Sequence, residues 1–250
     1  MKIKFTQFPK EFKILKKELN QKFNKISSQG QYILGKELKN FEENVKKYLK
    51  VKHVLGVGNW TEGTIMLLKA LEYKPGDQII TVSNSFIATC GAIAYAGMKP
   101  KLADVGDDLN IDCKKIEKLI NKKTKAIMPV HLSGIPSDLQ KIKKICKKNK
   151  IHLIEDAAHA FGTKYKNKFI GTFGECGAFS FYPTKTMGAI GDAGAIVTNN
   201  SSIYEDLLKL RNHGHVDRDN FKFPGFNSRL DEIQAIFLEK RLETIDLEIK

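Results

Sequence analysis

Two apolar segments of the sequence each end in side chains that could do chemistry. Residues 151–154 are followed by the carboxylates Glu155 and Asp156, and residues 178–182 lead to Lys185. Ligands of parallel α/β sheets sit beyond the carboxyl ends of the strands, so an acid and a lysine that follow two such strands are expected to share a pocket. Pyridoxal phosphate needs this pair, because a lysine forms its Schiff base and an acid faces its pyridine nitrogen.

Each of these residues also has a plainer interpretation. A buried carboxylate is unfavourable unless it is paired, so the partner of Asp156 could be a protonated pyridine nitrogen, an arginine, or solvent at the sheet edge. His159 could hydrogen-bond a phenolic oxygen or stack, although a lone histidine is more often structural. A lone lysine is usually solvated, whereas Lys185 beside a cationic ring in a dry pocket would have a lowered pKa and enough nucleophilicity for imine chemistry.

Two turns between strands and helices add candidate ligand contacts. The segment 58–64 links a strand to a helix, and free backbone N–H groups at such a helix start, helped by the Thr61 hydroxyl, make an anion site. Its glycine spacing matches neither a Walker A loop nor a dinucleotide fingerprint, and an ordinary tight turn is the alternative. Phe86, after the apolar run 78–82, could stack on a flat cofactor ring, or it could be a core or helix-start phenylalanine.

The elements that must position these residues follow an alternating pattern. Strands are predicted at 54–57, 78–82, 101–104, 125–130 and 151–156, with helices between them at 65–71, 87–96, 112–121 and 137–148. This alternation predicts βαβ units and a mainly parallel sheet. Further predictions are strands at 169–181 and 195–198, helices at 10–24 and 35–50, a loop at 27–30, and one long amphipathic helix at 229–250.

Length and composition describe an ordinary globular protein. The 250 residues can build one large core, or one domain with an appendage, and 42% of them are hydrophobic. No apolar run approaches the roughly 20 residues that span a bilayer, and the first residues do not form a signal peptide, so a cytoplasmic location without membrane contact is expected. The four cysteines are widely spaced and no helical His-Glu-x-x-His pair occurs, which predicts reduced thiols and no metal site.

The net charge of +14 allows three interpretations. A basic balance can indicate nucleic-acid binding, but the lysines are spread over helical segments such as 141–150 without interleaved aromatic residues. A solvated lysine-rich surface explains the same pattern, and a phosphate-bearing substrate would also benefit from the positive field. No nucleic-acid partner is expected, because no DNA-binding motif accompanies the charge.

Together, these residues make the chain similar to the DegT/DnrJ/StrS-type sugar aminotransferases, which are fold-type-I pyridoxal-phosphate enzymes. The resemblance covers almost all 250 residues, and the motifs occur in family order. They are the phosphate cup Asn59-Trp60-Thr61, the segment Ser85–Thr89 with its stacking Phe86, His131–Gly134, Glu155–His159, Ser180–Lys185 and Asn227-Ser228-Arg229. A usually small residue of the cup is replaced by Trp60.

The resemblance implies a role for each matched residue. Asp156 would face the pyridine nitrogen, with His159 beside the phenolic oxygen of the cofactor. Ser180 would bind the phosphate and Lys185 would form the Schiff base. Asn227 would reach the phosphate of the neighbouring subunit's cofactor, so a homodimer with a shared active site is implied.

The resemblance also implies a fold and a reaction. The fold would be the three-layer α/β/α large domain of fold type I. The reaction would be transfer of an amino group from an amino acid, with L-glutamate as the donor, to a nucleotide-diphosphate keto sugar in cell-surface polysaccharide or amino-sugar biosynthesis. The family includes dehydratases that carry histidine in place of the lysine, so Lys185 favours transamination.

The expected domain organisation has three parts. Residues 1–30 would form an N-terminal helical arm, residues 31–228 the pyridoxal-phosphate-binding large domain, and residues 229–250 the start of a long helix. In the family that helix leads to a smaller C-terminal domain, which is expected to be largely missing here. A non-catalytic cofactor-binding or regulatory relative, or a truncated fragment without full activity, is therefore the alternative.

Overall fold

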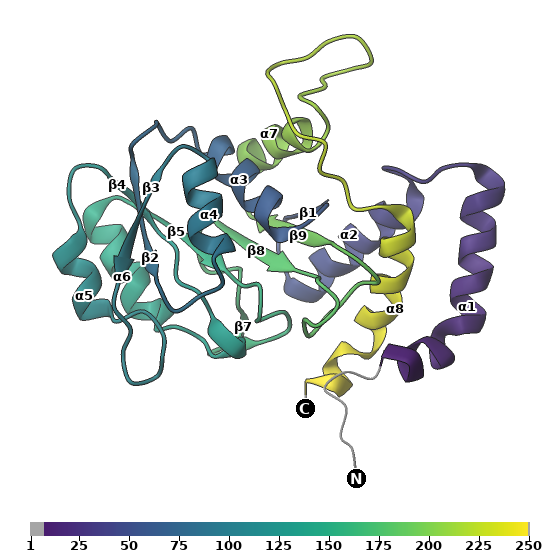
Figure 1. Ribbon diagram of the computed structural model, residues 1–250, viewed down its shortest axis with the longest axis horizontal. Coiled ribbons are helices and arrows are strands. Elements are labelled where there is room, and N and C mark those ends of the chain that lie inside the picture. The colour runs from purple at the N-terminus through teal and green to yellow at the C-terminus, as the bar shows by residue number, and fades with distance from the viewer. Residues whose placement is uncertain (1–7, 250) are drawn as a thin grey trace.

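A seven-stranded β-sheet lies at the centre of the protein (Figure 1). The structure is a computed structural model that describes residues 8–249. From one edge to the other, the strands are β1 (His53–Val57), β9 (Gly194–Thr198), β8 (Cys176–Ser180), β5 (His152–Asp156), β4 (Thr124–Ile127), β2 (Gln78–Val82) and β3 (Lys99–Ala103). Among them β9 runs antiparallel to its neighbours β8 and β1, and the remaining pairs are parallel. The prediction of a mainly parallel sheet is confirmed.

Helices cover both faces of this sheet and complete the three-layer α/β/α fold. One face packs against α3 (Trp60–Ala70), α4 (Ala88–Tyr95) and α7 (Ser201–Arg211), and the other against α2 (Lys36–Leu49), α5 (Cys113–Leu119), α6 (Leu139–Asn149) and α8 (Glu232–Glu248). Side chains along a strand alternate between the two faces, so Ala178 of β8 belongs to the first core and Phe179 to the second. Strands β8 and β9 are buried throughout because helices cover both faces of the sheet. Strands in this position have mostly apolar sequences without alternation.

Helix α3 begins at Trp60, whereas the sequence pattern predicts a helix from residue 65. Asn59 occupies the N-cap position, and its side-chain oxygen accepts a hydrogen bond of 2.9 Å from the backbone N–H of Glu62. Asparagine is among the strongest N-cap residues, so it starts the helix earlier than the apolar pattern does. The longer helix brings its first N–H groups to the carboxyl end of β1.

The predicted strand at 169–181 is wrong over its first half. The extended segments are β7 (Lys168–Phe169), which forms a small hairpin with β6 (Lys164–Tyr165), and β8. The chain between them turns at Gly171, where φ is +85° and a Cβ would lie 2.5 Å from the ring of Phe179. A separate helix, α7, lies in a stretch for which the sequence pattern predicts no element.

The N-terminal helix packs on the C-terminal one. Helix α1 (Phe8–Gln29) is longer than the predicted helix at 10–24 and includes most of the predicted loop, of which Gly30 remains as a turn residue with φ +65°. Its Leu19 and Ile26 bury Ile236 and Phe237 of α8, while other residues of α8 face the sheet. The predicted long helix is confirmed as α8, which starts after the N-cap Asp231, but its amphipathic character is wrong because the helix is covered on two sides. The division into three parts stays a prediction.

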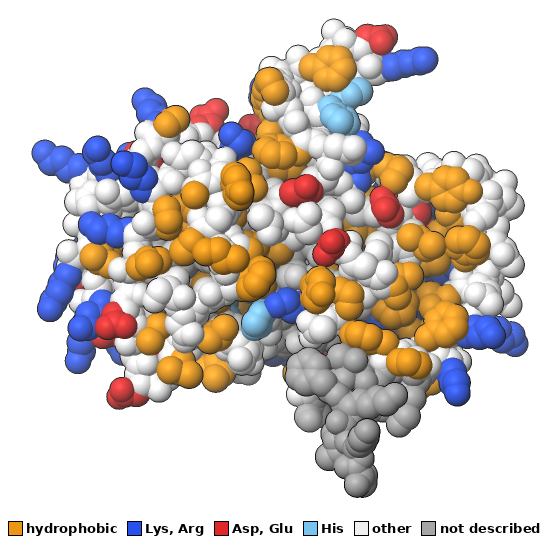
Figure 2. All heavy atoms as spheres, in the orientation of Figure 1, with side chains coloured by type: hydrophobic (Ala, Val, Ile, Leu, Met, Phe, Trp, Pro, Cys, Tyr) orange, Lys and Arg blue, Asp and Glu red, His pale blue; other side chains and the backbone are white. Residues whose placement is uncertain are grey.

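The surface of the protein combines charge with exposed apolar side chains. On the face shown in Figure 2, hydrophobic side chains gather across the middle, while lysines and arginines project mainly from the edges. Within residues 8–249, no helix is long and apolar enough to cross a membrane. The same residues contain no cluster of His, Cys, Asp or Glu that could hold a metal ion.

Candidate active site

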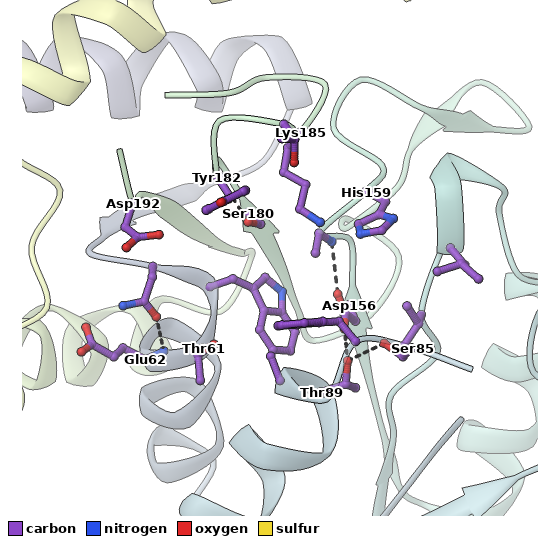
Figure 3. A pocket seen from close by; sticks show the side chains of 18 residues that line it. Thr61, Glu62, Ser85, Thr89, Asp156, His159, Ser180, Tyr182, Lys185 and Asp192 are labelled. Atoms are coloured by element: carbon purple, nitrogen blue, oxygen red, sulfur yellow. Dashed lines mark hydrogen bonds between the residues drawn. The ribbon is translucent and has the colours of Figure 1, made fainter. Parts of the chain in front are cut away.

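A cavity of about 750 Å³ opens beyond the carboxyl ends of the central strands (Figure 3). Its walls come from the start of α3, the turn between β2 and α4, and the segments that follow β4, β5 and β8. Of the predicted site residues, Trp60, Thr61, Phe86, Asp156, His159, Ser180 and Lys185 line it, and Asn227 does not. The fold therefore brings together side chains that lie up to 125 positions apart in the sequence. The volume suits a cofactor-sized ligand.

The start of α3 forms the end of the cavity suited to an anion. Backbone N–H groups in the first turn of a helix have no intrahelical acceptor, and those of Trp60 and Thr61 stand at this position. The helix dipole adds partial positive charge there. The turn is packed tightly against β9, because a Cβ at Gly194 would lie 2.9 Å from the Trp60 nitrogen. Thr61 and Ser180 add hydroxyl groups to the wall of the cavity.

Trp60 turns its side chain away from solvent. The indole is 6% exposed, and its Nε1 donates a hydrogen bond of 3.2 Å to the Ala178 carbonyl on β8. The side chain thus joins α3 to the sheet while also contributing to the cavity wall. The backbone N–H groups of the turn still stand at the start of α3, because the Trp60 side chain points to the sheet.

Asp156 is buried, yet its carboxylate lies at the cavity wall. Its Oδ2 accepts a hydrogen bond of 2.8 Å from Thr89 Oγ1, and its Oδ1 accepts one of 3.1 Å from the Ala158 N–H. Burial raises the pKa of Asp156 to about 6, although the bond from Thr89 opposes this shift. Among residues 8–249 the carboxylate takes part in no ion pair, so a cationic ligand group would compensate it best.

Lys185 enters the same cavity from the loop that follows β8. Burial lowers the pKa of its amine, and the Asp156 carboxylate partly offsets that effect. The loop is compact, since a Cβ at Gly188 would lie 2.2 Å from the Pro183 carbonyl oxygen. Helix α8 supports it from outside, where Arg241 Nη2 donates to the Thr186 carbonyl at 3.1 Å. The lysine is therefore a weaker base than in water and is held on a fixed backbone.

His159 stands beside Lys185 in the cavity (Figure 3). Its Nδ1 accepts a hydrogen bond of 3.3 Å from the Ser133 N–H, so in the neutral ring Nε2 carries the proton and can donate it to an oxygen. Burial and the charge of Lys185 lower the pKa of His159, which favours the neutral form. Phe86 is 75% exposed at the mouth of the cavity, and the alternative of a core phenylalanine is wrong.

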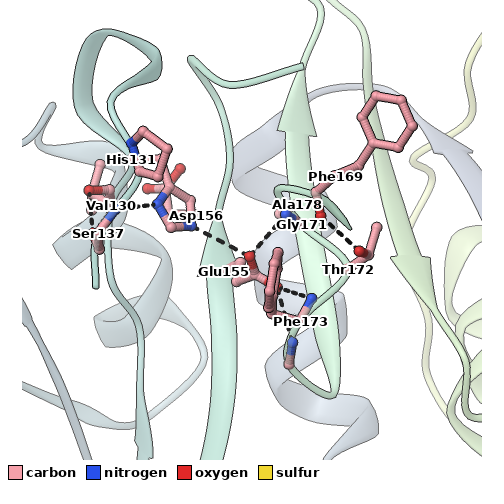
Figure 4. A network of polar contacts seen from close by, with 12 residues as sticks. Val130, His131, Ser137, Glu155, Asp156, Phe169, Gly171, Thr172, Phe173 and Ala178 are labelled. Carbon is pink, nitrogen blue, oxygen red and sulfur yellow. Dashed lines mark hydrogen bonds and ion pairs between the residues drawn. The ribbon is translucent and has the colours of Figure 1, made fainter. Parts of the chain in front are cut away.

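Glu155 lies on the other side of β5 and does not enter the cavity (Figure 4). Its carboxylate accepts hydrogen bonds of 2.6 to 2.9 Å from the N–H groups of Gly171, Phe173 and Gly174. The other buried neighbour is His131, whose Nε2 lies 3.4 Å from Glu155 Oε2. Of the two carboxylates after the apolar run 151–154, Asp156 alone reaches the predicted pocket.

Two further residues depend on contacts that the sequence does not reveal. Thr89 was part of a matched motif, but its bond to Asp156 joins positions 67 apart and has no local signal. Asn227 is exposed and lies outside the cavity of its own chain. The next residue, Ser228, accepts a hydrogen bond of 3.2 Å from the Gly58 N–H, which places this loop beside the turn before α3.

Comparison with known proteins agrees with this arrangement. The DegT/DnrJ/EryC1/StrS aminotransferase family matches residues 13–250. A pleiotropic regulatory protein of Geobacillus stearothermophilus is 37% identical over 98% of the chain and 66% of the relative. A dTDP-3-amino-3,6-dideoxy-alpha-D-galactopyranose transaminase of Aneurinibacillus thermoaerophilus is 41% identical over 92% of the chain and 64% of the relative.

The fold has matches among solved structures as well. The crystal structure of DesV from S. venezuelae, in complex with a ketimine intermediate, superposes with a TM-score of 0.95 at 34% identity and covers 98% of the chain. The chain spans 66% of that protein, so it corresponds to about two thirds of these relatives. Aminotransferases of the matched family depend on pyridoxal phosphate. With the family match over nearly the whole chain, this protein belongs to the DegT/DnrJ/EryC1/StrS aminotransferase family.

Proposed function

We propose that this chain binds pyridoxal phosphate and transfers an amino group from an amino acid, L-glutamate, to a nucleotide-linked keto sugar. The product would be an amino sugar for cell-surface polysaccharide or another amino-sugar pathway. The observation that carries the proposal is that Asp156, His159 and Lys185 line one cavity. The same cavity is also lined by the first residues of α3, whose backbone N–H groups have no intrahelical acceptor. Family membership supports the same reaction class.

The residues of the cavity fit the cofactor. The unpaired N–H groups of Trp60 and Thr61, with the hydroxyl of Ser180, would hold the phosphate. Asp156 would hold the protonated pyridine nitrogen, which supplies the cation that its buried carboxylate lacks. Phe86 would cover the ring from the mouth of the cavity. When bound, the cofactor supplies an electron sink for negative charge at the substrate α-carbon.

The side chains of the protein would then divide the remaining tasks. Lys185 would attach the cofactor through its amine and move a proton to and from the substrate carbon, because its lowered pKa leaves more of the amine neutral. His159 would donate a hydrogen bond from its Nε2–H group to the phenolic oxygen of the ring. Asp156 would keep the ring nitrogen protonated, and the cavity walls would limit the access of water.

A homodimer with a shared active site is part of the proposal. Asn227 lies outside its own cavity, so contact with a cofactor phosphate requires a second subunit. Large apolar side chains at both ends of α4 are exposed, with Ile87 at 74% and Tyr95 at 78%, and an interface would cover them. We also place the protein in the cytoplasm, because four free cysteines suit a reducing compartment.

A second function is regulatory binding of the cofactor without turnover. It is favoured by the similarity to the pleiotropic regulatory protein of Geobacillus stearothermophilus. The cavity described above would bind the cofactor in either case. The two functions differ in whether an amino donor changes the bound cofactor.

The visible absorption spectrum with pyridoxal phosphate, before and after glutamate is added, tests both functions. For an aminotransferase we expect a band of the lysine-bound cofactor that glutamate removes, and Lys185→Ala should not show this band. A band that glutamate leaves unchanged would support the regulatory function. If no band forms with the wild-type protein, the proposal of pyridoxal-phosphate binding is wrong.

Substrate identity requires a separate measurement. The glutamate-treated protein can be mixed with keto sugars linked to dTDP, UDP or GDP, and the amino-sugar product followed by mass spectrometry. Conversion of one nucleotide sugar together with return of the original band would support the acceptor class. Return of the band with simple keto acids alone would overturn it.

A further inference from the structure

The Thr89 side chain reaches away from its own helix. Thr89 is the second residue of α4, where a hydroxyl could bond to nearby backbone groups, but α4 has no side-chain cap. Instead Thr89 Oγ1 donates to Asp156 Oδ2 on β5, at 2.8 Å, and the threonine is 2% exposed. A buried hydroxyl that bonds a carboxylate across two elements has a charge-assisted bond, which is stronger than a neutral one.

The direction of the next hydrogen bond follows from the chemistry of hydroxyl groups. Ser85 Oγ lies 2.7 Å from Thr89 Oγ1, and either oxygen could donate in isolation. An ionised carboxylate only accepts, so the single hydroxyl proton of Thr89 is used on Asp156. Ser85 must therefore donate to Thr89. The two hydroxyls form a chain of hydrogen bonds that ends on Asp156 (Figure 3). By the argument above, both of their protons point toward the carboxylate.

Among the groups around Asp156, the Thr89 hydroxyl is the side chain that makes a hydrogen bond to its carboxylate. The Ala158 N–H holds Oδ1, and His131 and Lys185 act on the carboxylate only through their charge. The neighbouring Glu155 is bound to the N–H groups of residues 171–174 on the opposite side of β5. Burial disfavours the ionised form of Asp156, and the bond from Thr89 opposes that effect.

We propose that Thr89 is a positioning residue for Asp156, and that Ser85 fixes the Thr89 hydroxyl so that the carboxylate stays ionised and aimed into the cavity. The proposal rests on the proposed function where it assigns Asp156 to the ring nitrogen. The same short segment would then supply both Phe86, which covers the ring, and Thr89, which orients the group beneath it. It gives the reaction two hydroxyls that act through the Asp156 carboxylate.

The chain offers a matched control in Thr81. This threonine is also buried, on β2, and its Oγ1 donates a hydrogen bond of 2.8 Å, but the acceptor is the Met128 carbonyl. Thr81→Val and Thr89→Val each remove one buried hydroxyl and keep the side-chain shape. Only the second removes a donor from Asp156. Thr89→Ser, which keeps the hydroxyl, is the conservative variant that should restore wild-type behaviour.

The direct test is a carbon-13 NMR titration of the Asp156 carboxyl group in the full chain without cofactor, assigned with Asp156→Asn. Removing a donor from the ionised form should raise the pKa in Thr89→Val by about one unit. Thr81→Val and Thr89→Ser should titrate like the wild type. Ser85→Ala should move the pKa in the same direction by less. A Thr89→Val titration that coincides with the wild type would overturn the proposal.

Two additions keep the result decisive. If Thr89→Val does not fold, Ser85→Ala decides, and an unchanged Asp156 titration in that variant would count against the proposal. With cofactor, the acid limb of the glutamate half-reaction should move to higher pH in Thr89→Val and not in Thr81→Val. Failure of the wild type to bind cofactor would refute the proposed function. The titration without cofactor would still test whether Thr89 positions the Asp156 carboxylate.

Discussion

Glu155 and Asp156 are consecutive residues at the end of β5, yet their carboxylates lie in opposite environments. Three backbone N–H groups bind Glu155, and His131 lies beside it, so its oxygens are satisfied within the fold (Figure 4). Asp156 has one hydroxyl and one N–H as donors and opens to the cavity. Alternation along a strand sends neighbours to opposite sides.

The difference separates a structural acid from one suited to chemistry. The bonds of Glu155 join β5 to the loop before β8, which aligns the two strands whose ends carry Asp156 and Lys185. Burial raises the pKa of Asp156 although the hydrogen bond from Thr89 and the charge of Lys185 oppose the shift, and perturbed groups of this kind concentrate at functional sites. Substitutions on the two sides should therefore affect different quantities.

The largest effect is expected from Lys185→Ala, on the cavity side. Loss of the amine removes the group that carries the cofactor and moves the proton, so the glutamate half-reaction should slow by about 10⁴-fold. Single-turnover absorption kinetics would measure it. The matched control is Lys168→Ala, because burial also lowers the pKa of Lys168, which lies on β7 outside the cavity. Equal losses in both variants would contradict the assignment.

Glu155→Gln should act on stability rather than on chemistry. An amide nitrogen would face backbone N–H groups that now donate to the carboxylate, so the free energy of unfolding should fall by about 3 kcal/mol. Urea unfolding measures this change, and Glu175→Gln, at an exposed position nearby, is the control. If the Glu155→Gln protein folded with normal stability but lost its turnover, Glu155 would have a role in the chemistry and the structural assignment would be wrong.

Asp156→Asn should show the converse pattern. The ring nitrogen would lose its negative partner, so turnover should fall by about a hundredfold. Stability near neutral pH should be unchanged or higher, because a buried charge without an ionic partner is removed. Steady-state assays and urea unfolding of the same preparation give both quantities. Strong destabilisation with normal turnover per folded molecule would show that Asp156 is structural.

The smallest expected effect is the pH dependence of stability without cofactor. The pKa of Asp156 is raised in the fold from 3.8 to about 6. The protonated carboxyl group therefore adds to the free energy of unfolding. This added stability is fully present below the pKa of the unfolded chain and is lost as pH rises through the pKa of the folded protein. Relative to Asp156→Asn, the wild type should lose about 1 kcal/mol between about pH 5 and about pH 7. Unfolding curves of both proteins at these pH values provide the test. A wild type that gained relative stability on the same rise would contradict the raised pKa.

The sequence by itself determined the mainly parallel sheet and the ends of its central strands. Apolar runs and turn residues are local signals, and a parallel sheet places the carboxyl ends of its strands at one edge. Asp156, His159 and Lys185 could therefore be assigned to a common pocket before any distance was known. Boundaries were less predictable where a single cap such as Asn59 outweighed the apolar pattern.

Tertiary structure alone decided what surrounds those residues. Thr89 and Asp156 are 67 positions apart, Glu155 binds a loop that the apolar pattern assigns to a strand, and α1 covers a side of α8. The indole of Trp60 bonds to a strand 118 positions away. Such contacts depend on how packed side chains meet through space, and the periodicity of a segment carries no information about its distant partner. The pocket is thus encoded locally, and its electrostatics are set by the fold.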